Sequence, residues 1–368
     1  MTEQENIRYG YYKDIYTALD AITEAQKIAF YPIFFQAIVC MKNKGILTCI
    51  DQAGKRGICF DEIAKQISLS PYAIELLLDI GLSMHVIYKN DGHYILGKVG
   101  HYLLHDKMTE VNLNFTQDIC YQSMFYLQES LESGKPEGLK VFGNWKTIYP
   151  ALQSLPKKAK DSWFEFDHFY SDHSFPIAFS HITQLNPKHI YDVGGNTGKW
   201  AIYCAKHNPN IKVTLLDLPE QISVAENNIK QAGFDDRIDF YSVNLLTAEI
   251  LPNEADIWWM SQFLDCFSIE QITHILKLIH SSMKDDAIVC IMDLFWDRQS
   301  FEAGALSLNA SSLYFTCLAN GNSRFYHSKV FYNCLKNAGF YVEKDIDNLG
   351  YGHTLLICKK LISNKQTK

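Results

Sequence analysis

The sequence lacks the features that mark a nucleic-acid-binding or membrane-spanning protein. Its formal net charge is −7 over 368 residues, and no basic stripe interrupts this acidic balance, so a phosphate backbone is an unfavourable partner. No apolar run reaches the roughly 20 residues that span a bilayer. The opening stretch MTEQENIRYG has no apolar segment of the kind found in a signal peptide. We therefore expect no nucleic acid, no membrane partner and a cytoplasmic location.

Closely spaced cysteines are also lacking. The ten cysteines are scattered singly and never form a C-x-x-C pair, and several lie in apolar strand or helix patterns. Reduced, mostly buried thiols in a cytosolic protein are the interpretation that this spacing favours. The sequence accordingly predicts no metal cofactor.

What is present is a globular composition, 47% hydrophobic and 20% charged, in a chain long enough for two domains. The stretch FDEIAKQISLSPYAIELLLDIGLSM predicts two short amphipathic helices. Asp61 is the expected N-cap of the first helix, and Ser70-Pro71 is expected to start the second. The Asn90-Asp91-Gly92 stretch between two alternating runs predicts a hairpin. Helix, helix and hairpin form a winged-helix arrangement, which we assign to residues 1–106.

A winged helix can bind DNA, but this one favours protein association. The second helix carries Glu75 and Asp79 and no basic residue, so a phosphate backbone would repel it. The preceding run AFYPIFFQAIVCM is apolar around most of its circumference and needs burial on more than one side. A homodimer formed through this domain is the prediction.

Residues 107–180 are expected to form a helical region that contributes to a substrate pocket. Its last part, DSWFEFDHFYSDHSF, is dense in aromatic residues and contains His168 and His173. A plain hydrophobic core explains the aromatic residues. The alternative is a pocket wall for a planar ligand, with a histidine facing inward.

From residue 187 onward, apolar strand patterns alternate with helix patterns, which predicts a mainly parallel sheet covered on both faces. A helix is expected between Pro219 and Gly233, and another begins after an expected N-cap at Ser328. The end of the chain, FYVEKDIDNLGYGHTLLICKK, predicts an antiparallel hairpin. We assign residues 181–368 to an α/β, Rossmann-like domain with a seven-stranded sheet.

The stretch IYDVGGNTGKW, residues 190–200, contains a glycine-rich turn between a strand and a helix. Gly194, Gly195 and Gly198 do not complete the G-x-G-x-x-G spacing of a dinucleotide site. Asp217 ends the next strand, where a carboxylate can accept both hydroxyls of a ribose, and Asp192 can balance a cationic ligand. The pattern suits a nucleoside without phosphate and disfavours a nicotinamide-dependent oxidoreductase.

These stretches resemble the class I S-adenosylmethionine-dependent methyltransferases. More closely, DVGGNTG, FDEIAKQISLSP and ADIWWMSQFLDCFSIEQ resemble the O-methyltransferase family of plant phenolic and bacterial polyketide-tailoring enzymes. The resemblance implies an N-terminal winged-helix dimerisation domain and a Rossmann-like catalytic domain. It implies S-adenosyl-L-methionine as the cofactor, S-adenosyl-L-homocysteine as the product, and a small-molecule acceptor.

The resemblance also implies roles for single residues in cofactor binding. The three glycines would wrap the amino-acid part of the cofactor, Asp217 would hold the ribose hydroxyls, and Leu218 would be a further cofactor contact. The further expected contacts are Asn244 and Leu245 at the adenine, Phe267 stacked on it, and Ser261, which replaces a lysine of the plant members.

The expected base is where the chain departs from the family. Asp265 stands where the family has a histidine that removes the acceptor proton, and Asp293 matches a bracing carboxylate. An ordinary aspartate with a pKa near 4 suits a phenol poorly unless burial raises its pKa. His327 and His353 are alternative bases, as are His168 and His173. Three functions stay open: O-methylation of a hydroxyl on a small aromatic metabolite, C- or N-methylation, and cofactor binding without methyl transfer.

Overall fold

The computed structural model describes Tyr11 and residues 13–361 of the chain. The chain divides into two units, the first ending at Asn114 and the second beginning at Phe115. Among the described residues, no single helix combines the length and apolar composition needed to cross a membrane; α2 (Ala18–Asn43) with α3 (Ile46–Gln52), which meet at a 59° bend, satisfy those criteria only as a pair. The domain boundaries at 106 and 180 stay a prediction.

The first unit is the helical domain with the two-stranded wing that its pattern predicts. Strands β1 (Ile87–Asn90) and β2 (His93–Leu96) pair antiparallel across Asp91 and Gly92, which both have positive φ. Helix α5 begins at Pro71 with Ser70 as its N-cap, as expected. The elements are α2, α3, η1 (Gly54–Arg56), α4 (Phe60–Gln66), α5 (Pro71–Ser83), β1, β2, α6 (Lys98–His105) and α7 (Lys107–Phe115).

The predicted cap of α4 was wrong by two positions. The helix begins at Phe60, and the N-cap is Cys59 rather than Asp61. The carboxylate of Glu62 accepts a hydrogen bond from the Cys59 backbone N–H at 3.2 Å. The Cys59 side chain in turn accepts from the Glu62 backbone N–H, which completes a capping box. This box satisfies free donors of the first turn, and Asp61 lies inside the helix.

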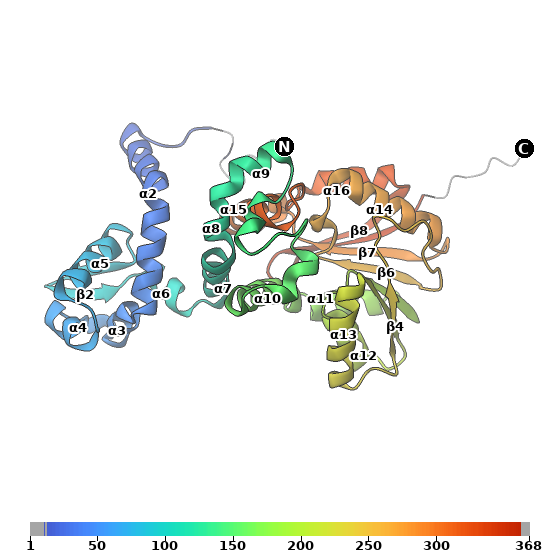
Figure 1. Ribbon diagram of the computed structural model, residues 1–368, viewed down its shortest axis with the longest axis horizontal. Helices are drawn as coiled ribbons and strands as arrows, with labels where there is room; N and C mark the ends of the chain where they lie inside the picture. Colours follow the sequence, from blue (N-terminus) through green and yellow to red (C-terminus); the bar gives the residue numbers. More distant parts are fainter. Residues whose placement is uncertain (1–10, 12, 362–368) are drawn as a thin grey trace, which may run out of the picture. The chain divides into compact units, whose positions relative to one another are not determined.

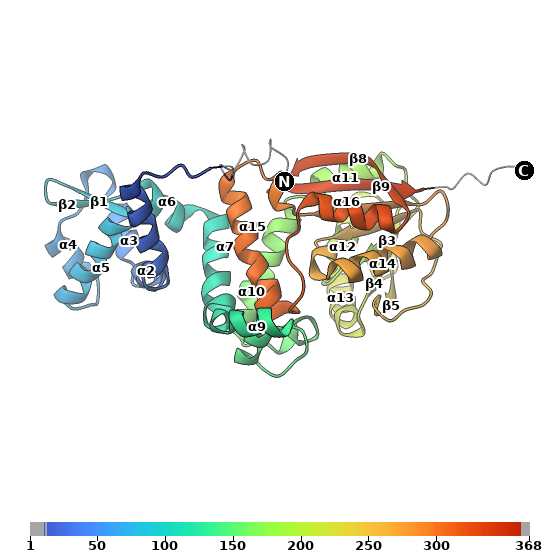
Figure 2. The ribbon, with the colours of Figure 1, turned by 90° about the horizontal axis from the view of Figure 1, so that it is seen from above.

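The second unit opens with short helices that pack around α10 and α15. Their shared apolar core includes Phe115, Trp163, Leu308 and Tyr314, and Figure 2 shows α10 beside α15. These elements are η2 (Thr116–Cys120), α8 (Tyr121–Ser123), η3 (Met124–Tyr126), α9 (Leu127–Ser133), η4 (Glu137–Val141), η5 (Tyr149–Ser154), α10 (Lys157–Asp172), α11 (Phe175–Thr183), α15 (Glu302–Tyr314) and η8 (Phe315–Ala319).

The seven-stranded sheet of the second unit confirms the predicted Rossmann-like fold with its terminal hairpin (Figure 1). Its order is β5-β4-β3-β6-β7-β9-β8, in which the first five strands run parallel and the last two antiparallel. The strands are β3 (His189–Val193), β4 (Lys212–Asp217), β5 (Ile238–Ser242), β6 (Ile257–Ser261), β7 (Ile288–Asp293), β8 (Phe340–Leu349) and β9 (His353–Lys360).

Helices cover both faces of this sheet, which explains the nearly continuous apolar strands. One face packs against α14 (Ile269–Ser282) and α16 (Ser328–Asn337) through residues such as Trp258 and Ile291. The other packs against α11, α12 (Lys199–His207) and α13 (Pro219–Ala232) through Trp259 and Met292. Adjacent residues of one strand therefore face opposite layers. The carboxyl ends of the parallel strands gather the polar side chains that the sequence singles out.

Ser328 was predicted to cap α16, and this is wrong. The N-cap is His327, whose Nδ1 accepts a hydrogen bond from the Lys329 backbone N–H at 3.2 Å. The Ser328 hydroxyl instead donates to the Asp297 carboxylate at 2.6 Å. A buried carboxylate partner holds the serine more strongly than a free helix N–H does.

Candidate cofactor site and active site

The glycine turn after β3 has a backbone that side chains would obstruct. Gly194 and Gly198 have φ values of 73° and 81°, in the left-handed region. A Cβ on Gly194 would collide with the ring of Phe263, and one on Gly195 would lie 2.7 Å from the Asp192 carboxylate. The turn therefore needs glycine both for its conformation and for the close approach of its neighbours.

Two acidic residues flank this turn at the carboxyl ends of neighbouring strands. Asp217, the last residue of β4, accepts hydrogen bonds from the backbone N–H of Asn196 at 2.9 Å and of Leu218 at 2.7 Å. Asp192 is 2% exposed, and one of its carboxyl oxygens has no hydrogen-bond partner among the described residues. Burial raises the pKa of Asp217 to about 6 and, together with the Asp217 charge, that of Asp192 to about 8.

The residues predicted near the adenine lie at or after the carboxyl ends of β5 and β6. Asn244 follows β5, and its side-chain oxygen accepts a hydrogen bond from the Leu246 N–H at 3.0 Å. Leu245 is buried in the core on the α14 side of the sheet. Ser261 ends β6 with a buried hydroxyl that has no partner among the described residues. Phe267 is partly buried, and its ring lies 4.9 Å from that of Phe263 in an edge-on arrangement.

Phe263 is a residue that the sequence analysis missed. Its ring covers Gly194 and contacts Phe267, so it joins the glycine turn to the segment after β6. The signal available in the sequence was its position two residues after β6, whose last residue, Ser261, was already a candidate. Only the parallel pairing of β3 with β6 places it on the turn.

Asp265 and Asp293 form a buried carboxyl pair. Asp265 lies in η6 (Leu264–Cys266), directly after β6, and Asp293 is the last residue of β7. They are 2% and 1% exposed, and the two side chains lie within hydrogen-bonding reach of each other. Oδ1 of Asp265 and Oδ2 of Asp293 are buried and have no hydrogen-bond partner among the described residues.

The pKa values of this pair are raised for a physical reason. Burial raises the pKa of Asp265 to about 7. Burial and the neighbouring Asp265 charge hold the pKa of Asp293 well above its ordinary range. Two carboxylates this close cannot both ionise easily, so the pair retains a proton near neutral pH. Such a pair is able to exchange a proton with a bound molecule.

Helix α10 lies over the glycine turn and brings in Asp167, which the sequence analysis did not single out. The side-chain amide of Asn196 donates to the Asp167 carboxylate at 3.5 Å. The neighbouring His168 has its Nε2 3.3 Å from the Thr197 hydroxyl. Burial raises the pKa of Asp167 to about 7 and lowers that of His168 to about 4, so His168 is neutral near pH 7.

The remaining candidate histidines belong to separate networks. His327 caps α16, 3.5 Å from the Asp297 carboxylate, and its ring meets that of Trp296 edge-on. The His173 Nδ1 lies 2.7 Å from the backbone oxygen of Phe169 on its own helix.

His353 is held on the side of the sheet away from Asp293. Thr354 is the β9 partner of Asp293, so the preceding His353 faces the opposite layer. There its Nδ1 lies 2.8 Å from the hydroxyl of Ser174, the N-cap of α11. His353 is fully buried, and burial lowers its pKa to about 3. A neutral imidazole with so low a pKa is a weak proton acceptor.

Comparison with known proteins identifies the family. Residues 173–341 match the O-methyltransferase domain, and residues 23–94 match the Dimerisation2-like domain. The chain belongs to the S-adenosylmethionine-dependent O-methyltransferase family. The protein is therefore a methyltransferase with S-adenosylmethionine as its cofactor.

Relatives of this methyltransferase span nearly its whole length. It is 24% identical over 317 residues to the L-tyrosine C(3)-methyltransferase of Streptomyces lavendulae, covering 83% of this chain and 84% of that protein. The structure of the S-adenosylmethionine-dependent methyltransferase SibL superposes with a TM-score of 0.71 at 21% identity, covering 92% and 99% of the two chains. The structure of the mitomycin 7-O-methyltransferase MmcR superposes with a TM-score of 0.69 at 16% identity, covering 93% of this chain and 98% of that chain. At these identities the structural likeness shows the fold.

The residues of the methyltransferase fit its cofactor on their own chemistry. The glycine turn packs closely against Phe263 and Asp192, and a buried Asp192 oxygen has no partner among the described residues. A buried carboxyl oxygen without a partner is costly. A ligand that supplies hydroxyl donors and positive charge would remove that cost.

Proposed function

We propose that this methyltransferase methylates a hydroxyl group on a small aromatic molecule, with Asp265 and Asp293 together as the proton acceptor. The observation that carries the proposal is the buried carboxyl pair at the ends of β6 and β7. A pKa of about 7 at Asp265 lies much closer to a phenol near 10 than an ordinary carboxylate does.

The cofactor would lie across the carboxyl ends of β3, β4 and β5. Asp217 would accept the ribose hydroxyls, and Gly194, Gly195 and Gly198 would leave room for the amino-acid part. Asp192 would balance positive charge beneath the turn. The adenine would be bounded by Leu218, Asn244, Leu245 and Phe267, with Ser261 at the floor.

When bound, S-adenosylmethionine supplies a methyl group activated by a positively charged sulfur for an in-line displacement. The chain orients the acceptor and handles its proton. The unprotonated oxygen of the carboxyl pair would take the proton that the acceptor hydroxyl loses when it is methylated, and S-adenosylhomocysteine would be the leaving group. Because both acids are buried, water competes little for that proton.

Aromatic side chains pack in one cluster with Cys266 and Leu294, which directly follow Asp265 and Asp293 in the chain, and this cluster favours an aromatic acceptor. The Trp163 indole N–H donates to the Tyr314 hydroxyl at 2.6 Å, and Phe115 lies between the rings of Tyr314 and Phe166, stacked on the latter at 4.0 Å. Burial holds the pKa of Tyr314 well above its usual value, and the Asp167 charge contributes to the same effect. Asp167 and the aromatic cluster therefore share one environment.

Methylation of an aromatic ring carbon is the second candidate. The observation that favours it is the similarity to a protein named as an L-tyrosine C(3)-methyltransferase, together with an aspartate where the family has histidine. The same carboxyl pair would then take the proton of the phenol while the ring carbon is methylated. The hydrogen of that carbon would leave as a proton and the phenol oxygen would regain one, so that the net change is one ring hydrogen replaced by methyl.

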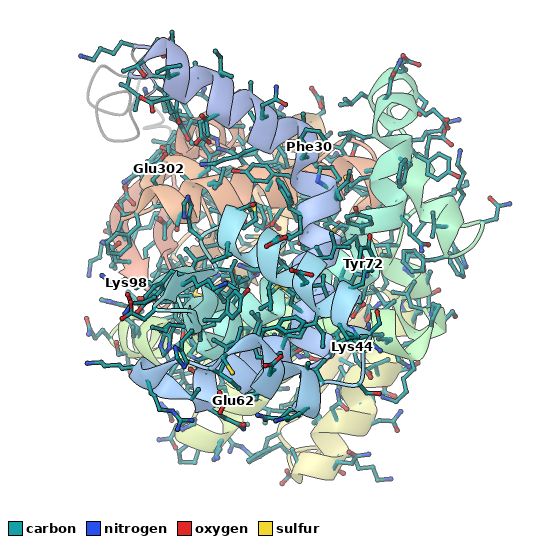
Figure 3. The ribbon with its side chains drawn as sticks, turned by 90° about the vertical axis from the view of Figure 1, so that its left-hand side faces the viewer. Phe30, Lys44, Glu62, Tyr72, Lys98 and Glu302 are labelled. Carbon is teal, nitrogen blue, oxygen red and sulfur yellow. The ribbon has the colours of Figure 1, made fainter. Side chains whose placement is uncertain are left out.

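We also propose that the first unit forms a homodimer. It matches a dimerisation-type domain, and α2 and α5 expose large apolar side chains; Figure 3 labels Phe30 and Tyr72 among them. Glu75 and Asp79 are exposed on α5, which opposes DNA binding. All ten cysteines are free, as is usual in the cytoplasm. The exposed apolar residues of α2 and α5 include Leu19, Ile22, Ile28, Phe30, Ile33, Tyr72 and Leu76.

The proposal is tested with labelled S-adenosylmethionine and a panel of phenols. Calorimetric titration with S-adenosylhomocysteine, with NADH as the control, first establishes that the enzyme binds its cofactor product. NMR of the product then distinguishes a methoxy group from a methylated ring carbon. Cofactor binding without labelled product from any phenol, catechol or hydroxynaphthoate would contradict the proposal.

A further inference from the structure

Two histidines and an aspartate of the first unit bring their ligand atoms together outside the proposed active site. His101 and His105 lie one turn apart on α6, and Asp51 lies on α3. One ligand atom from each residue lies within 4.8 Å of the other two. No element of the proposed cofactor site belongs to this unit, and the methyltransferase chemistry does not use these residues.

The geometry points to a site for a divalent transition-metal ion, with Zn²⁺ as the expected occupant, held by Asp51, His101 and His105. Two imidazoles and one carboxylate form a typical three-residue zinc ligand set, with water at the fourth position. Imidazole donors favour Zn²⁺, Ni²⁺ or Cu²⁺ over Mg²⁺ and Ca²⁺, which prefer oxygen ligands.

The side chains need only small movements to reach such an ion. His105 Nε2 already lies 2.9 Å from an Asp51 carboxyl oxygen, and the two histidine rings are 4.8 Å apart. Ligands about 2.0–2.2 Å from a tetrahedral ion lie about 3.3–3.5 Å from one another. Because the side chains of His105 and Asp51 are 45% and 33% exposed, rotation costs little packing. The metal replaces a proton between His105 and Asp51.

The ion would join two helices that flank the wing in the sequence. Helices α3 and α6 pack together in this unit, and β1 and β2 lie between them along the chain. Lys98, labelled in Figure 3, is the first residue of α6. An ion that binds the folded unit and finds no preformed site in the unfolded chain stabilises the fold by mass action.

The experiment uses the full-length chain, stripped of metal with a chelator. We expect calorimetry to show one Zn²⁺ per chain with micromolar affinity, Co²⁺ to give the visible bands of a four-coordinate ion, and saturating Zn²⁺ to raise Tm by several degrees. Equal concentrations of Mg²⁺ or Ca²⁺ should leave Tm unchanged.

His101→Ala is the decisive variant because it leaves the Asp51–His105 pair in place. It should weaken Zn²⁺ binding at least tenfold and abolish the Tm rise. His93→Ala, on β2 of the same unit, is the matched control and should bind as the unmodified chain does. The proposal is overturned if the unmodified chain binds no Zn²⁺, or if His101→Ala and His93→Ala bind it equally.

Discussion

The carboxyl groups of Asp265 and Asp293 meet at the ends of two neighbouring parallel strands, each almost completely buried. Strands β6 and β7 pair from Ile257 with Ile288 to Ser261 with Met292, and this register brings the segment after β6 beside the last residue of β7. Burial raises both pKa values, and the Asp265 charge raises that of Asp293 further. A carboxylate that is ordinarily a weak base thereby becomes a reasonable proton acceptor near neutral pH.

Asp265→Asn should lower kcat about 100-fold or more, because the amide cannot accept the acceptor proton. In the unmodified enzyme, kcat should rise as the pH increases through about 7, since Asp265 holds a proton below that pKa and is free to accept one above it. Initial rates with labelled cofactor measure both effects. Asp256→Asn is the control, and an unchanged kcat in Asp265→Asn would place the base elsewhere.

Asp217→Ala should weaken binding of S-adenosylhomocysteine about tenfold or more, because it removes charge-assisted hydrogen bonds to the ribose. Calorimetric titration measures the affinity. Asp239→Ala removes an exposed carboxylate on the adjacent strand β5 and should bind normally. Equal affinity in the two variants would remove Asp217 from the cofactor site.

Gly194→Ala should lower both cofactor affinity and Tm, through backbone strain and through a clash with Phe263. Gly233→Ala introduces the backbone strain alone. Both glycines have left-handed φ values, 73° and 76°. A Cβ at Gly233 meets no atom within 4 Å, whereas one at Gly194 collides with Phe263. Backbone strain of about 1 kcal/mol is therefore common to both variants. A thermal shift and a titration that do not distinguish the variants would count against the close packing of Phe263 on the turn.

His353→Gln should destabilise the fold without moving the pH profile of kcat. The fully buried imidazole contacts Ser174, so its replacement should cost about 1–3 kcal/mol of unfolding free energy. Denaturant unfolding and the pH dependence of initial rates are the measurements. If the folded variant loses its activity about 100-fold, His353 takes part in proton transfer.

The sequence alone predicts much of the cofactor site because its signals are local. A glycine-rich turn after an apolar strand, and an aspartate at the end of the next strand, need only the rule that parallel strands end at the same edge of a sheet. The terminal hairpin follows from its alternation and its glycine-containing loop. The local pattern of residues 190–217 therefore predicts a nucleoside-binding turn without any knowledge of distant contacts.

Contacts between distant segments were not predictable in this way. Asp167 meets the Asn196 amide only because α10 lies over the turn, and Phe263 covers Gly194 only because β6 pairs with β3. The capping of α16 by His327 depends on Asp297 holding Ser328. A strand or helix pattern carries no information about which loop will lie against it.

The sequence by itself determined the two-domain plan, the order of strands and helices in the catalytic half, and the identity of the residues at the strand ends. Tertiary structure decided their chemistry. Burial raises the pKa of Asp265 to about 7. Burial on the opposite face of the sheet, beside Ser174, keeps His353 neutral. The charge of a side chain is set by its surroundings, and those surroundings come from segments far apart in the chain.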